Sequence, residues 1–132
     1  MWASAALLLF LQAPDYSAQG VAALDAAKYS DAAELFAKAI AADPKDYAAH
    51  FHLALSYSML KRDVESIVEY KKALELKPGL YEAELNAGIL LLRDKQPADA
   101  TQYLQKAVEQ KPKEFRPRLY WAQSLLESGN AA

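Results

Sequence analysis

Two histidines are the natural starting point for any chemistry in this 132-residue chain. His50 and His52 are its only imidazoles, and they stand two positions apart. On a helix this spacing directs the two rings to different faces, whereas a helical metal pair needs a spacing of three or four residues. We therefore interpret His50 as a packing residue. His52 is expected to face a groove, where it could contact a partner.

Other reactive groups show no catalytic arrangement. Cysteine is absent, which excludes disulfides and thiolate metal sites. The sequence contains no glycine-rich phosphate loop and no nucleophile motif of the kind found at a sharp strand-to-helix turn. Carboxylate pairs such as Glu82 and Glu84 are typical of a solvated helix face. The chain is therefore predicted not to be an enzyme, and to use no cofactor, metal or small-molecule substrate.

The charge balance argues against a nucleic-acid partner. The chain has 15 basic and 17 acidic side chains and no run of basic residues, whereas nucleic-acid-binding proteins concentrate positive charge on one surface. A content of only four glycines, with many alanines, leucines and lysines, favours helix over sheet.

Residues 1–12 form an apolar N-terminal segment with two possible roles. Its stretch Ala3–Leu11 is too short to cross a bilayer as a helix. It could be the hydrophobic part of a secretory signal, although no Lys or Arg precedes it and Pro14 would hinder cleavage. It could instead be a helix that packs on the rest of the domain. The first role predicts a secreted or envelope protein and the second a cytoplasmic one, and the sequence leaves both open.

Three prolines reveal how the rest of the chain is organised. Pro44, Pro78 and Pro112 are 34 residues apart each time, and a constant interval of this size indicates a repeated structural unit. Aligning the chain on them gives three units at residues 13–46, 47–80 and 81–114, followed by a partial fourth unit at 115–132.

Each unit contains two helical patterns joined by a turn. In the second pattern, apolar or small residues recur at spacings of four, three and one, which places them on one face of a helix. These residues are Ala32, Phe36, Ala39 and Ile40 in the first unit, Ser66, Tyr70, Ala73 and Leu74 in the second, and Ala100, Leu104, Ala107 and Val108 in the third. In the first pattern a small residue recurs, which predicts a tight contact between helices: Gly20, Ala54, Gly88 and Ala122. Turns are expected near residues 27–29, 61–63 and 95–97, with Asp63 capping the next helix and Pro97 in a first helical turn.

The chain resembles the tetratricopeptide repeat family, whose pattern is an aromatic residue, then Leu, Gly and Tyr in the first helix and Ala, Phe and Pro later. The second unit carries the pattern most fully, with Leu53, Ala54, Tyr57, Ser66, Tyr70, Ala73 and Pro78. The leading aromatic place keeps an aromatic residue only in the first unit, since it holds Tyr16, His50, Glu84 and Arg118 in turn. Each later unit instead opens with an aromatic residue, Tyr47, Tyr81 or Phe115. The resemblance implies an all-α, right-handed superhelical solenoid of antiparallel helix pairs, with three repeats and a terminal helix.

The resemblance also implies that the first helices line a concave surface. The groove residues expected there are Phe51, His52, Leu55, Met59, Leu85, Asn86, Ile89, Leu92, Leu119 and Tyr120. Most are apolar, and an exposed apolar strip commonly marks an interaction site. We therefore expect a non-catalytic scaffold that binds a protein partner through a hydrophobic or amphipathic peptide or helix. Phe51, Leu55, Leu85 and Ile89 are the predicted centre of this site.

Several alternatives remain open at the level of sequence. Residues 2–11 could cover the strip, or the chain could be an accessory segment of a larger enzyme or cell-envelope assembly. A known binding mode of the family holds the C-terminal carboxylate of a partner through Lys and Asn side chains. In this chain only Asn86 and Arg116 occupy comparable places, so this binding mode is not expected. The terminal helix at residues 115–128 has more apolar residues than the third unit can bury. It predicts either further repeats or pairing of two chains.

Overall fold

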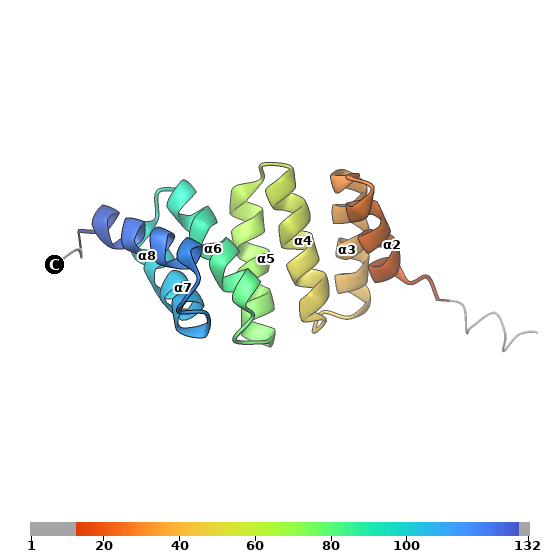
Figure 1. The fold of residues 1–132 in the computed structure, drawn as a ribbon. Coiled ribbons are helices and arrows are strands. Elements are labelled where there is room, and N and C mark those ends of the chain that lie inside the picture. The colour runs from red at the N-terminus through yellow and green to blue at the C-terminus, as the bar shows by residue number, and fades with distance from the viewer. Residues whose placement is uncertain (1–12, 130–132) are drawn as a thin grey trace, which may run out of the picture.

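The computed structural model describes residues 13–129. These residues form seven α-helices and no strand: α2 (Tyr16–Asp25), α3 (Tyr29–Ala42), α4 (Tyr47–Met59), α5 (Asp63–Leu76), α6 (Tyr81–Arg93), α7 (Pro97–Gln110) and α8 (Phe115–Glu127). The helices stand side by side in chain order, and each packs on the one before it and the one after it (Figure 1). The predicted all-α solenoid of helix pairs is confirmed. The apolar segment 1–12 lies outside the described residues, so both roles suggested for it stay predictions.

The turn inside each unit has the same backbone structure. Ala27, Lys61 and Lys95 adopt φ values of 58°, 61° and 60°, in the left-handed region. In the first turn the Lys28 amide donates to the Ala23 carbonyl at 2.8 Å, and the Ala27 amide donates to the Leu24 carbonyl at 2.9 Å. The other two turns repeat this pair of bonds. Such a motif satisfies the last carbonyls of a helix and reverses the chain.

The helix starts differ more than the turns do. Asp46 caps α4, because its Oδ1 accepts from the amides of Ala48 and Ala49 at 3.0 and 3.1 Å. Pro97 begins α7, as predicted. The prediction that Asp63 caps α5 is wrong, since Arg62 occupies the cap position. The Asp63 carboxylate instead accepts two bonds of 2.6 Å from Arg93, an ion pair 30 residues apart in sequence.

Small residues of the first helices lie against large residues of the second helices, as predicted. A Cβ atom on Gly20 would lie 2.7 Å from the ring of Phe36, and one on Gly88 would lie 2.5 Å from Leu104. Ala54 is fully buried. Ala122, the fourth member of the series, is exposed, because no helix follows α8 within the described residues.

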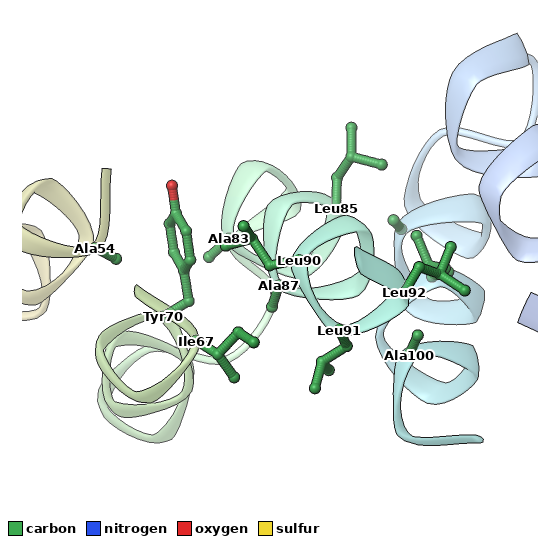
Figure 2. Packing of buried hydrophobic residues seen from close by; sticks show 12 residues of the cluster. Ala54, Ile67, Tyr70, Ala83, Leu85, Ala87, Leu90, Leu91, Leu92 and Ala100 are labelled. Carbon is green, nitrogen blue, oxygen red and sulfur yellow. The ribbon is translucent and has the colours of Figure 1, made fainter. Parts of the chain in front are cut away.

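The larger core cluster spans α4 to α7, and Figure 2 shows how its side chains surround α6. It consists of Ala54, Ile67, Tyr70, Ala83, Leu85, Ala87, Leu90, Leu91, Leu92, Ala100, Leu104 and Ala107. A smaller cluster of Ala32, Ala33, Phe36 and Leu53 joins α3 to α4. The apolar residues of the second-helix pattern therefore form the core that holds neighbouring units together.

Two buried polar residues complete the interior. His50 is 5% exposed, with Nδ1 2.6 Å from a Glu69 carboxylate oxygen and Nε2 3.0 Å from the Pro44 carbonyl. Its predicted packing role is confirmed. The prediction that Glu84 is solvated is wrong, because Glu84 is 4% exposed and accepts a hydrogen bond from Gln110 at the end of α7. Burial raises the pKa of the Glu84 carboxyl.

Candidate peptide-binding surface

The ten predicted groove residues lie on α4, α6 and α8. The structure does not join them into one continuous strip. Instead, most of them line three separate hollows, which we name by the helices that border them. The chemistry of each hollow follows from the side chains that these helices bring together.

The α2–α4 hollow has a volume of about 340 Å³ and gathers three of the predicted residues, His52, Leu55 and Met59. The remaining lining residues are Val21, Leu24, Asp25 and Tyr29. Met59 is 47% exposed and Val21 39% exposed, and Leu55 is half-buried. This hollow therefore offers apolar side chains from two adjacent first helices to the same space.

His52 supplies the polar element of the α2–α4 hollow. Its ring stacks on Phe36, with centroids 5.1 Å apart and an angle of 24° between the planes. Burial lowers the pKa of His52, so the ring is neutral near pH 7. The carboxylate of Asp25 is then the charged side chain among the lining residues. The hollow favours an apolar or neutral group over an anionic one.

The α6–α8 hollow, of about 390 Å³, brings together the predicted residues Ile89, Leu92 and Tyr120. Its other lining residues are Arg93, Lys95, Gln123 and Glu127. The Arg93 guanidinium is held by Asp63 at 2.6 Å. This second hollow is thus more polar than the first, and its arginine is already paired.

The α4–α6 hollow lies where these two helices begin and has a volume of about 280 Å³. Its lining residues are Tyr47, Ala48, Phe51, Leu80, Tyr81, Glu82 and Lys111. Phe51 packs edge-on against Tyr70, with centroids 5.5 Å apart, and the Lys111 ammonium lies 3.9 Å from the centroid of the Tyr81 ring. Tyr47 and Tyr81, which line this hollow, were not among the predicted groove residues. The signal that could have found them is the aromatic residue that opens each later unit.

Two predicted groove residues belong to the core. Leu85 is 3% exposed and Leu92 is 7% exposed, and both lie in the larger core cluster. Figure 2 shows Leu85 on the opposite side of α6 from Leu91, so α6 buries apolar residues on more than one face. Asn86 donates its amide to the Tyr70 hydroxyl at 3.2 Å. Of the four residues predicted at the centre of the site, Phe51, Leu55 and Ile89 therefore lie near the surface, whereas Leu85 packs in the core.

Comparison with known proteins decides the family. Residues 17–81 match the family model described as Tetratricopeptide repeat. These residues carry tetratricopeptide repeats. No curated protein matches the sequence.

Solved tetratricopeptide repeat structures share the fold at low sequence identity. The first such domain of Spaghetti (RPAP3), bound to an HSP90 peptide, is 18% identical with a TM-score of 0.79, covering 86% of this chain and 90% of that one. YrrB, described as having an unusual peptide-binding site, is 22% identical with a TM-score of 0.83, covering 89% of this chain and 61% of YrrB. MamA is 18% identical with a TM-score of 0.82, covering 87% of this chain and 63% of MamA. This chain spans less than two thirds of YrrB and MamA.

Residues 13–129, which the structure describes, show neither a candidate metal site nor a candidate membrane-spanning helix. They contain no group of three or more His, Cys, Asp or Glu side chains that could hold a metal ion. None of their helices combines the length and the apolar character needed to cross a membrane.

Proposed function

We propose that this tetratricopeptide repeat chain is a non-catalytic protein-interaction module that binds an apolar or amphipathic peptide, as a helix, across its first helices. The observation that carries the proposal is the α2–α4 hollow. There Val21, Leu55 and Met59 leave apolar surface accessible on two adjacent helices. The RPAP3 domain bound to an HSP90 peptide and the peptide-binding YrrB lend support, because they have the same fold.

The partner is expected to insert a large apolar side chain into the α2–α4 hollow. Helix-in-groove recognition works by placing such anchors from one face of an amphipathic helix. Burying one anchor contributes about 1.5–3 kcal/mol, which corresponds to a change of roughly ten- to a hundredfold in the dissociation constant. One hollow of this kind can therefore dominate the affinity of a peptide.

An acidic peptide tail suits this surface less well. The second RPAP3 domain binds the HSP70 peptide SGPTIEEVD, which is rich in carboxylates near its end. In this chain the α2–α4 hollow contains the acidic Asp25 and an imidazole, His52, whose pKa burial lowers. Asn86 already donates to Tyr70. The charges therefore favour an apolar anchor over an anionic tail.

A displayed library of 20-residue peptides, selected on the immobilised protein, supplies the probe. Enriched peptides are labelled and titrated by fluorescence anisotropy. The variant Leu55→Glu should weaken their binding by roughly ten- to a hundredfold while leaving the helical circular dichroism signal and the melting temperature nearly unchanged. The matched control is Val64→Glu, which puts the same charge at a 60% exposed apolar position on α5 and should leave binding intact.

A second control separates the surface from the core. Ala54→Glu should unfold the domain, because Ala54 is fully buried beside Leu55. If Leu55→Glu unfolds the protein to the same extent, the hollow is part of the core and the proposal is wrong. An accessory segment of a larger enzyme or cell-envelope assembly would use the same surface, so the experiment also applies to that alternative.

A further inference from the structure

Helix α8 exposes apolar residues at places of the repeat where α6 buries or half-buries its residues. In α6 these places hold Tyr81, Leu85, Gly88 and Leu92, of which Leu85 is 3% exposed and Leu92 is 7% exposed. The residues 34 positions later are Phe115, Leu119, Ala122 and Leu126, which we call the α8 seam. Phe115 is 68% exposed, Leu119 49% and Leu126 69%. Helix α8 thus keeps the apolar pattern of an interior helix on a face that no other described residue covers.

The spacing within the α8 seam is that of paired helices. Its residues follow one another at intervals of four, three and four, the spacing of the apolar positions in a two-helix heptad pattern. They span 12 residues, so the first and last lie about 16 Å apart along the helix. Pro117 and Ser124 are both buried and occupy the opposite side of α8, where the Thr101 hydroxyl donates to Ser124 Oγ at 3.0 Å. The seam therefore faces away from the rest of the solenoid.

We propose that a second copy of this chain covers the α8 seam, with the two α8 helices antiparallel about a two-fold axis. The seam is symmetric about its midpoint, between Tyr120 and Trp121. Pairing on that axis places Phe115 against Leu126 of the second copy. It also places Leu119 against Ala122 of the second copy, so that a large side chain meets a small one. A surface that complements itself in this way forms a closed, isologous dimer.

The flanks of the α8 seam are compatible with this arrangement. Arg116 and Gln123 lie along one edge, and Arg118 and Leu125 lie along the other. Antiparallel pairing brings Arg116 beside Gln123 of the second copy and Arg118 beside Leu125 of the second copy. Neither arginine faces another cation. A contact between two single helices is smaller than the standard interface of about 1,600 Å², so the dissociation constant is expected in the micromolar range.

Sedimentation equilibrium of the whole chain, over about 5–500 µM to bracket a micromolar dissociation constant, tests the proposal. The wild-type protein should pass from monomer to dimer within this range. Leu126→Glu and Phe115→Lys should each weaken association by about a hundredfold, because each change occurs twice in a symmetric dimer. The control Val64→Glu alters an exposed apolar residue on α5 and should leave the dissociation constant unchanged.

Mixing the two seam variants tests the antiparallel geometry. The introduced glutamate of one copy then meets the introduced lysine of the other, while the second Phe115–Leu126 contact of the dimer remains apolar. The mixture should therefore recover most of the association that each variant loses alone. A wild-type protein that stays monomeric throughout the range overturns the proposal, as does equal weakening by Val64→Glu. Failure of the mixture to recover overturns the antiparallel pairing.

Discussion

Glycine at the left-handed turn positions should make the protein more stable. Ala27 and Lys61 adopt φ values of 58° and 61°, a conformation that costs a residue with a Cβ atom roughly 1–2 kcal/mol. Glycine avoids this cost, but it also gives the unfolded chain more freedom, which offsets about 0.4–1 kcal/mol. The net gain for Ala27→Gly or Lys61→Gly is therefore about 0.5–1 kcal/mol. The corresponding place in the partial fourth unit already holds Gly129, at φ 78°.

Urea denaturation followed by circular dichroism measures the effect. Each substitution should raise the free energy of unfolding by about 0.5–1 kcal/mol, and the melting temperature by about 2–4 °C for a chain of this size. The double variant should show nearly the sum of the two gains, because the positions lie in different turns and share no partner.

A lysine in the middle of a helix provides the matched control. Lys106 is exposed on α7, so Lys106→Gly removes the same charge and also places glycine in a helix. It should lower stability by about 0.7 kcal/mol. If Lys61→Gly also lowers stability, then the backbone at residue 61 is not in the left-handed region and the reasoning fails.

Two ionisable residues give further predictions. Burial raises the pKa of the Tyr70 hydroxyl to about 12, so the stability that this group contributes is present below about pH 10 and lost as the pH rises towards 12. An ultraviolet titration should show a phenol that ionises near pH 12, and Tyr70→Phe should remove that phase; persistence of the phase in the variant would contradict the assignment to Tyr70. The hydrogen bond from Arg93 lowers the pKa of Asp63, so their pair contributes above about pH 4 and is lost as the pH falls. Because the pair is solvent-exposed, Asp63→Asn should lower the free energy of unfolding by only about 0.5 kcal/mol at pH 7 and should leave it unchanged near pH 2. Urea denaturation at the two pH values measures the difference, and an equal loss at both would contradict the pairing.

The features that repeat every 34 residues were accessible from the sequence. The helix pairs, the turn positions and the contact of Gly20 and Gly88 with the next helix all follow from spacings of three, four and 34 residues. They could be predicted because they depend on residues within one unit. Even the packing role of His50 followed from its spacing to His52.

The features that depend on side-chain pairs far apart in the sequence were not accessible. Asp63 binds Arg93 rather than capping its own helix, and Glu84 is buried beneath Gln110. These pairs are 30 and 26 residues apart, and helical periodicity carries no information about side-chain pairing over such distances. The sequence predicts which face of a helix a residue occupies. It does not predict whether a neighbouring unit covers that face.

One row of the repeat shows why this distinction matters for function. Phe51, Leu85 and Leu119 occupy the same place in successive units, yet Phe51 is half-buried, Leu85 is buried and Leu119 is 49% exposed. Their chemistry is similar, so the difference arises from what packs against each helix. Helix α6 has helices on both sides, whereas α8 has none on one side within the described residues. In this row an apolar side chain is therefore most exposed at the edge of the described repeats, and there it forms part of the surface that we propose a second copy covers.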